Sequence, residues 1–222
     1  MFSAKYAVKT VSRRKKRNIL TILGLAIGVA MVASAQIATD TMIVSFSDLV
    51  FSEIGEVDVW IGLKNDSMFD QSTYNLIANN DSVQNEISPN GITPRIIIYG
   101  LANDPDTGQI ETNVAIVGIN DTLDQHFGKL TDIETGEERF VKDLGLDEII
   151  IGRSLANTLN TEEGQTIVVG FTDNSDDIVN FQLTIKYIVK NSEKATWNGG
   201  DSLFLSLQRL RTLYGAGLND IN

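Results

Sequence analysis

The stretch VSRRKKRNILTILGLAIGVAMVASAQIATD, residues 11–40, places five consecutive basic residues directly before a long apolar run. Residues 18–39 contain no charged side chain. A helix of this length extends about 33 Å, which is enough to cross a hydrocarbon core of about 30 Å. We therefore expect a transmembrane helix over residues 18–39, preceded by a basic tail over residues 1–17.

The distribution of charge predicts the orientation of this span. Its basic cluster consists of Arg13, Arg14, Lys15, Lys16 and Arg17. The first 17 residues contain seven of the 18 lysines and arginines and none of the 29 acidic residues, so the remainder carries a formal net charge of −18. Because basic residues beside a span stay on the cytoplasmic side, we expect a cytoplasmic N-terminus. Residues after about 40 are then external to the cell (plasma) membrane.

A cleaved secretion signal is the alternative interpretation of the same stretch. Ala33-Ser34-Ala35 has the small-residue pattern of a cleavage site. The apolar core from Ile19 to Ala35 is longer than the roughly 7–15 residues usual for a signal. Apolar residues also continue at helical spacing as far as Ile54. This spacing favours a retained helix that continues into a stalk over residues 40–56.

Small residues within the span indicate contact with another membrane helix. Gly24 and Gly28 form a GxxxG pair. A further run of small residues follows at four-residue spacing: Ala26, Ala30, Ser34 and Ala38. Because small side chains let two helix backbones approach closely, we expect Gly24, Gly28, Ala30 and Ser34 to lie in a helix–helix interface.

The external region, residues 57–222, has the composition of an ordinary globular domain. The chain contains no cysteine, so a disulfide scaffold is excluded and the fold requires an apolar core. The acidity of this region argues against binding to nucleic acid and against adsorption to anionic lipid headgroups.

Alternating short strands and helices predict an α+β fold for this region, with two subdomains, the second near residues 145–200. Strands are expected at 56–63, with Val57, Val59 and Ile61 on one face, and in a hairpin of residues 92–102 and 109–119. Helices are expected at 72–80, capped by Ser72, and at 120–127, capped by Asn120 or Asp121. The remaining elements expected are a strand, helix and strand within 149–171, a strand at 178–189, and a strand and helix within 201–215.

The sequence contains no catalytic or cofactor-binding motif. One histidine, His126, and no cysteine exclude His/Cys zinc sites and a thiol nucleophile. The patterns GxxxxGK[ST], GxSxG and HExxH do not occur. We expect His126 to be a packing or surface residue, and we predict no catalytic residue, cofactor or metal site.

Two acidic turns partly resemble calcium-binding loops. Asp104 and Asp106 share the D-x-D-x-G opening, and Asp173, Asp176 and Asp177 cluster in TDNSDD. Neither turn has the full ligand spacing, and both lie between predicted strands, where Asp and Gly are favoured by turn geometry alone. A structural turn is therefore the preferred interpretation of both.

Three stretches, taken together, resemble the MacB/FtsX-like ABC transporter permeases. RRKKRNILTILGLAIGVAMVA (13–33) is similar to the first span of that family. DEIIIGRSLANTLNTEEGQTIVV (147–169) is similar to its external-domain signature, and DSLFLSLQRLRTLYG (201–215) to its later strand and helix. Where the family usually has Gly-Asp, this chain has Gly164-Gln165, so we expect no acidic functional role there.

The resemblance implies a permease subunit that transmits ATP-driven motion from a cytoplasmic ABC ATPase to its external core domain. The implied output is export, lipoprotein release or cell-envelope signalling. The implied partners are the ATPase subunit, a second permease chain of the same or a sister sequence, and membrane lipid, with no nucleic acid. ATP hydrolysis would reside in the ATPase, so the chain itself is not expected to be an enzyme. Because the family has three later spans, we expect this chain to be an N-terminal fragment.

The alternative function is a single-span, membrane-anchored binding or sensor module. Such a module would use its span only as a tether, and it predicts no ATPase partner.

Overall fold

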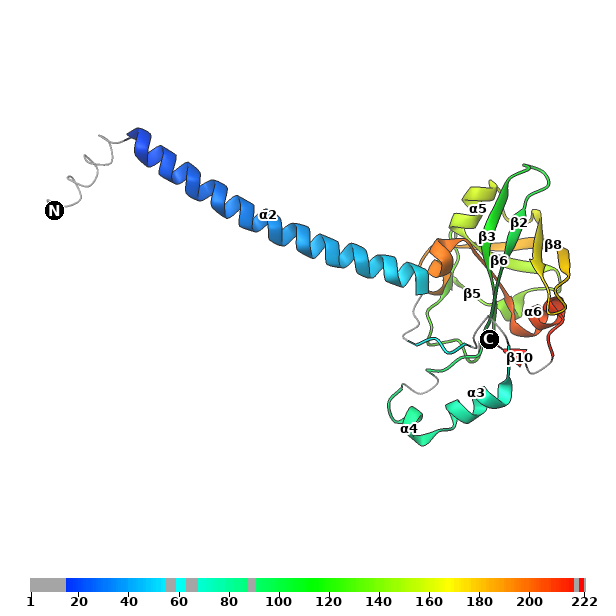
Figure 1. The fold of residues 1–222 in the computed structure, drawn as a ribbon. Coiled ribbons are helices and arrows are strands. Elements are labelled where there is room, and N and C mark those ends of the chain that lie inside the picture. Colours follow the sequence, from blue (N-terminus) through cyan, green and yellow to red (C-terminus); the bar gives the residue numbers. More distant parts are fainter. Residues whose placement is uncertain (1–14, 55–58, 63–67, 88–90, 218–219, 222) are drawn as a thin grey trace. The chain divides into compact units, whose positions relative to one another are not determined.

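The computed structural model describes residues 15–54, 59–62, 68–87, 91–217 and 220–221 (Figure 1). The chain divides into two compact units, Met1–Leu49 and Val50–Asn222. Helix α2 (Lys15–Ile54) accounts for the described part of the first unit and continues into the second.

The second unit combines short helices with strands. Its α-helices and 3-10 helices are α3 (Gln71–Ala78), α4 (Asp81–Gln84), η1 (Val141–Asp143), α5 (Arg153–Leu159), η2 (Glu193–Gly200) and α6 (Leu207–Tyr214). Its strands are β1 (Phe69–Asp70), β2 (Ile96–Asn103), β3 (Ile110–Ile119), β4 (Leu130–Thr131), β5 (Glu138–Arg139), β6 (Glu148–Gly152), β7 (Thr166–Thr172), β8 (Ile178–Val189), β9 (Ser202–Ser206) and β10 (Asp220–Ile221). This content confirms the predicted α+β class.

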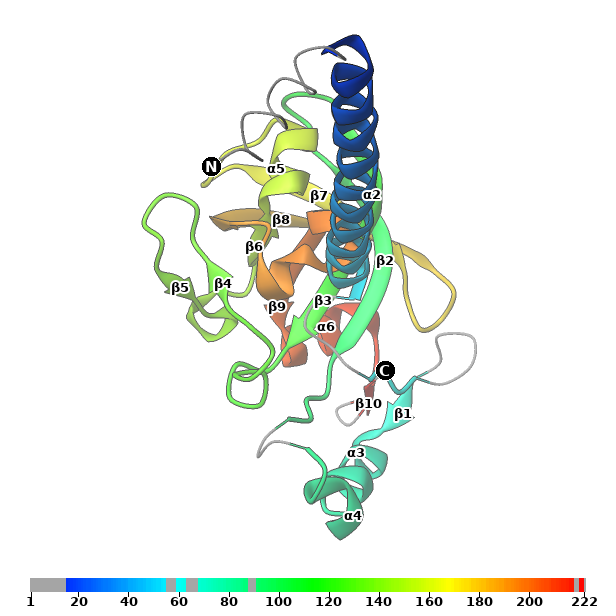
Figure 2. The ribbon, with the colours of Figure 1, turned by 90° about the vertical axis from the view of Figure 1, so that its left-hand side faces the viewer.

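Six strands close into a barrel in the order β2-β3-β9-β6-β8-β7. Strands β2 and β3 form the predicted hairpin, and β2 also pairs with β7, with Leu101 opposite Gly170, which closes the barrel. The pairs β3–β9 and β6–β8 are parallel, whereas the other neighbours are antiparallel. The small β4–β5 hairpin stands beside the barrel (Figure 2).

Both faces of the central strands are buried, which explains their uninterrupted apolar sequences. In β6, Ile149 and Ile151 join a cluster that includes residues of α5 and α6, whereas Ile150 joins a second cluster that includes Trp197. Strands β3 and β9 divide their residues between the same two clusters. A strand that is buried on both sides needs apolar residues at every position rather than at alternate ones.

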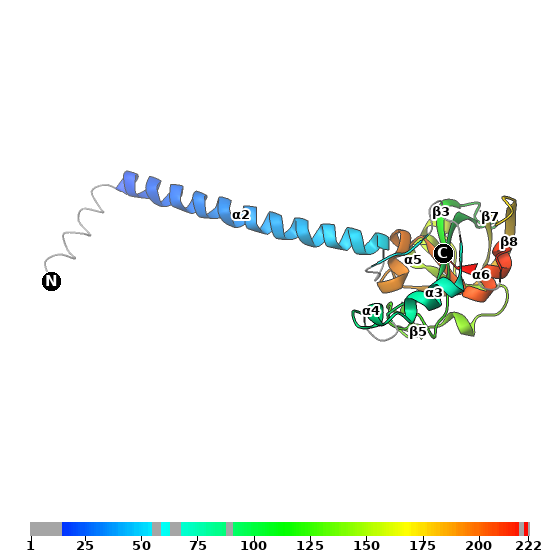
Figure 3. The same ribbon diagram turned by 60° about the horizontal axis from the view of Figure 1, so that its bottom comes forward.

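The barrel takes strands from both sides of residue 145, and the division into two subdomains stays a prediction. Strands β6, β8 and β7, from the expected second subdomain near 145–200, are consecutive neighbours and close one barrel together with β2, β3 and β9. The second unit is therefore built around one barrel, and α3 and α4 lie outside it (Figures 1 and 3).

Three local predictions were wrong. Helix α3 is capped by Asp70, whose side chain accepts a hydrogen bond from Ser72 N at 2.7 Å, and not by Ser72. Residues 120–127 form turns instead of a helix, and His126 is exposed. Residues 59–62, the part of the expected strand 56–63 that the structure describes, are not in a strand; Val57 lies outside the described residues.

Candidate functional site

Within the described ranges, one helix is long and apolar enough to cross a membrane, namely the segment Ile19–Phe46 of α2. Its large apolar side chains are exposed, from 53% for Ile27 to 76% for Leu20 and Met42. A continuous apolar surface of this size is unfavourable in water, whereas lipid chains would cover it.

Three hydroxyl groups in this segment donate hydrogen bonds to carbonyl groups of the same helix. Ser34 Oγ donates to Ala30 O at 2.7 Å, Thr39 Oγ1 to Ala35 O at 2.9 Å, and Thr41 Oγ1 to Ile37 O at 2.8 Å. Because hydrocarbon offers no hydrogen-bond partner, this pattern suits a helix that lies in lipid.

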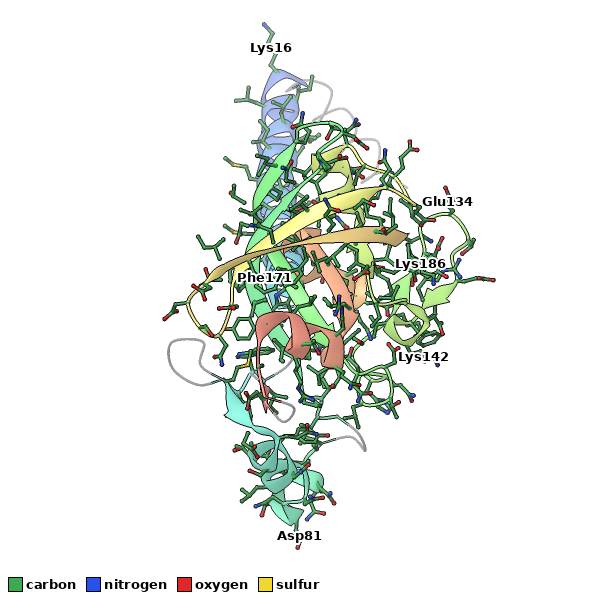
Figure 4. The ribbon with its side chains drawn as sticks, turned by 90° about the vertical axis from the view of Figure 1, so that its right-hand side faces the viewer. Lys16, Asp81, Glu134, Lys142, Phe171 and Lys186 are labelled. Carbon is green, nitrogen blue, oxygen red and sulfur yellow. The ribbon has the colours of Figure 1, made fainter. Side chains whose placement is uncertain are left out.

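The predicted topology cluster flanks the start of α2. Arg13 and Arg14 lie outside the described residues, whereas Lys15, Lys16 and Arg17 form the first turn of the helix. Lys16 is exposed and marks this end in Figure 4. The orientation that this cluster predicts stays a prediction.

The predicted helix-packing residues fall on two faces of α2 rather than on one. With 3.6 residues per turn, Gly24 and Gly28 define one line, and Ala30 and Ser34 lie on a second line about 120° away. A Cβ placed on Gly24 or Gly28 meets no described atom within 4 Å. Both glycines are thus open to a neighbouring helix, and the interface itself stays a prediction.

The sequence analysis missed a buried cluster of charged residues. Arg95 Nε donates to Asp124 Oδ1 at 2.8 Å, and Lys194 Nζ donates to Asp124 Oδ2 at 2.8 Å. The exposed fractions of Arg95, Asp124 and Lys194 are 5%, 0% and 8%. Nearby, burial raises the pKa of Asp121, although its carboxylate accepts hydrogen bonds from the backbone N–H groups of Val141 and Lys142. The members of the cluster lie far apart in the sequence and share no local pattern that would predict it.

A cavity of about 350 Å³, here named the α3 cavity, lies within the second unit between the α3–α4 helices, residues 59–61 and the segment 91–95 that leads into β2. Its walls are largely apolar and include Trp60, Tyr74, Ile77 and Phe127. The ring of Trp60 also lies 5.5 Å from that of Trp197, centroid to centroid. The walls of the cavity therefore come from distant parts of the chain.

Two polar side chains, Thr93 and Arg95, also line the α3 cavity. Thr93 Oγ1 is buried and has no hydrogen-bond partner among the described residues. Arg95 Nη2 lies 2.8 Å from Asp124 Oδ1 and forms an ion pair with it. The hydrogen bond to this oxygen comes from Arg95 Nε, and Nη2 makes no hydrogen bond within the described ranges. The cavity thus combines apolar walls with the Thr93 hydroxyl, which has no partner among the described residues, and with a guanidinium that is ion-paired to Asp124.

The acidic turns use their carboxylates to hold backbone. Asp104 Oδ1 accepts from Asp106 N at 2.8 Å, and Asp173 Oδ1 accepts from Ser175 N at 2.8 Å and Asp177 N at 3.0 Å. At the departure from the family pattern, Gln165 Oε1 accepts from Thr161 Oγ1 and Glu162 N. These contacts account for the acidic and amide side chains as loop-forming groups.

Comparisons with known proteins extend over most of the chain. The family model for the MacB-like periplasmic core domain matches residues 19–221. The periplasmic region of MacB from Actinobacillus actinomycetemcomitans is similar at 14% identity and a TM-score of 0.42, over 69% of this chain and 63% of that one. The extracellular domain of the noncanonic ABC-type transporter YknZ from Gram-positive bacteria is similar at 16% identity and a TM-score of 0.44, over 71% of each chain. No curated protein sequence matches the chain.

Proposed function

The chain belongs to the MacB-like periplasmic core domain family, and from this premise we propose that it is a permease subunit that couples a cytoplasmic ABC ATPase to an external domain. The observation that carries the proposal is that one family match runs continuously through the apolar helix and the barrel. In this arrangement, residues 18–39 cross the membrane, the N-terminus is cytoplasmic and the barrel is external.

The form of α2 supports a role in transmitting motion. The helix is unbroken from Lys15 to Ile54 and continues eight residues beyond Phe46, the end of the candidate span. It contains no proline, and an uninterrupted hydrogen-bonded helix transmits displacement better than a flexible linker of the same length. We propose that residues 40–56 act as a stalk between the span and residues 57–222, the external domain.

The proposal is tested by altering the stalk between Phe46 and Ser47. A flexible Gly-Ser insertion should leave ATP hydrolysis by the assembled complex intact and abolish ATP-dependent movement of the external domain. A helix-forming insertion of Ala, Glu and Lys with the same length is the matched control and should retain movement. Because the chain has no cysteine, movement is measured between single spin labels at Lys142→Cys on the paired chains. Undiminished movement with the flexible insertion would exclude a transmitting stalk.

The α3 cavity favours a second candidate, a membrane-anchored binding module. The two functions differ in their partners. If the chain is a permease subunit, the full chain purified from membranes should bring an ATPase subunit with it, and this association should depend on α2. A binding module should bring no ATPase with it.

A further inference from the structure

We propose that the α3 cavity binds the acyl chain of a membrane-derived lipid whose head group carries hydrogen-bond-accepting oxygen. The cavity volume of about 350 Å³ lies within the range of roughly 300–1,000 Å³ that is typical of small-molecule sites. The inference rests on the membrane attachment in the proposed function and does not depend on coupling to an ATPase.

The walls match a hydrocarbon chain. Tyr74 and Ile77 from α3, Val83 from α4, and Ile92 and Phe127 from the barrel side all line the space. Water in such a space would find few polar partners, so an apolar ligand is the favoured occupant.

The polar groups define the head group. Thr93 Oγ1 is buried and has no hydrogen-bond partner among the described residues. Arg95 Nη2 is also buried; it lies 2.8 Å from Asp124 Oδ1 in an ion pair but makes no aligned hydrogen bond there. Both can donate a hydrogen bond, and a guanidinium cannot accept one. The complementary ligand therefore carries a carboxylate or an ester carbonyl. A cationic head group would be repelled, because the cluster of Arg95, Lys194 and Asp124 has two basic groups and one acidic group.

The length of chain between the apolar segment and the cavity wall limits how far the α3 cavity can lie from membrane lipid. Residues 47–54 continue α2 for about 12 Å beyond Phe46. The next five residues, to Val59 in the cavity wall, can extend at most about 18 Å. Covalent connection thus limits this wall to within about 30 Å of the end of the apolar segment, so membrane lipid is the apolar molecule present at the highest local concentration.

Photolabelling of the full chain in lipid nanodiscs tests the proposal. The probe is dodecanoate with a terminal diazirine, and labelled peptides are identified by mass spectrometry. We expect labels on peptides from 59–62 and 71–87, competition by unlabelled dodecanoate, and at least about tenfold weaker competition by dodecyltrimethylammonium. Labelling of residues 19–46 in the same sample reports membrane attachment separately.

Two pairs of variants make the result specific. Ile77→Trp fills the cavity and should reduce labelling of residues 71–87 by about tenfold, whereas Leu76→Trp, at a position on α3 that is 72% exposed, should not. Thr93→Val preserves shape and should reduce the preference for dodecanoate over the cationic competitor. Labels confined to 19–46, equal labelling of Ile77→Trp and Leu76→Trp, or equal competition by both amphiphiles would overturn the proposal.

Discussion

Lys194 Nζ lies 2.8 Å from Asp124 Oδ2, although 70 positions separate the two residues and both are buried. Arg95 engages the other oxygen of the same carboxylate from the segment that leads into β2. One aspartate therefore joins η2, the 120–127 turns and the start of the barrel. The same arginine lies over the ring of Phe127 at 5.2 Å, which links this junction to the wall of the α3 cavity.

Removal of Asp124 should be more damaging than removal of either cation. Asp124→Ala leaves two buried cations without their carboxylate counterion, and we expect the free energy of unfolding to fall by about 3–5 kcal/mol. Lys194→Met should cost less, because Arg95 and Asp124 remain paired and the methionine fills the space of the lysine stem. Urea denaturation of the full chain in detergent, followed by fluorescence of its two tryptophans, measures both values. An equal or reversed order would contradict this account.

Local sequence predicted the elements whose structure depends on neighbouring residues. The β6–α5–β7 unit follows from the apolar run at 149–151, and α5 ends at Leu159, before Asn160 with φ of 53°. The helix α6 likewise ends at Gly215, with φ of 72°. Residues that suit left-handed backbone conformations mark such helix ends in the sequence itself.

Long-range contacts decided the elements that sequence analysis missed. Barrel closure depends on Leu101 lying opposite Gly170, and hydrophobic periodicity does not specify which strands pair. The expected helix at 120–127 is replaced by turns in which Asp121 binds the backbone of Val141 and Lys142 while Asp124 enters the buried cluster. These tertiary hydrogen bonds outweigh the local preference for helix. The α3 cavity also escaped prediction, because its walls come from separate segments.

Asp132 should make the stability of the second unit depend on pH. Burial acts to raise its pKa, but hydrogen bonds from Thr135 N, Arg139 Nε and Glu134 N outweigh burial and lower the pKa below its ordinary value. A carboxyl group with a lowered pKa in the folded state stabilises the fold above its unfolded pKa. That contribution is lost as the pH falls through its folded pKa.

Asp132→Asn should therefore lower the free energy of unfolding by about 1–3 kcal/mol at neutral pH and by progressively less in acid. Denaturation of the full chain at a series of pH values gives the profile. Glu134→Gln makes the same change of charge at an exposed neighbouring position (Figure 4) and serves as the control. A difference between wild type and Asp132→Asn that persists unchanged in acid would show that the ionised carboxylate is not responsible.

The proposed topology predicts which residues can be reached from outside an intact cell. Lys142 is exposed on the second unit (Figure 4), and Lys5 lies in the basic tail. A membrane-impermeant maleimide should label Lys142→Cys in intact cells and label Lys5→Cys only after lysis. The absence of native cysteine removes background labelling. The reverse pattern would place the barrel in the cytoplasm, and labelling of neither residue in intact cells would argue against an external domain.

The two lines of small residues on α2 predict that substitutions on different faces of the helix have different effects on association. Gly24→Ile with Gly28→Ile adds bulk where the backbones of two helices can approach most closely, so we expect at least a tenfold loss of association, about 1.4 kcal/mol.

Ala30→Ile with Ser34→Ile, about 120° around the helix, should weaken association less if the glycine line forms the main contact between paired permease chains. Ile22→Leu with Val29→Leu occupies a third face and provides the control of similar hydrophobicity. Energy transfer between labelled full-length chains in bilayers, titrated against lipid, measures association for each pair. If the glycine pair and the control pair associate equally well, the chains do not meet through this face, and transmission of motion between them would have to pass through the external domains.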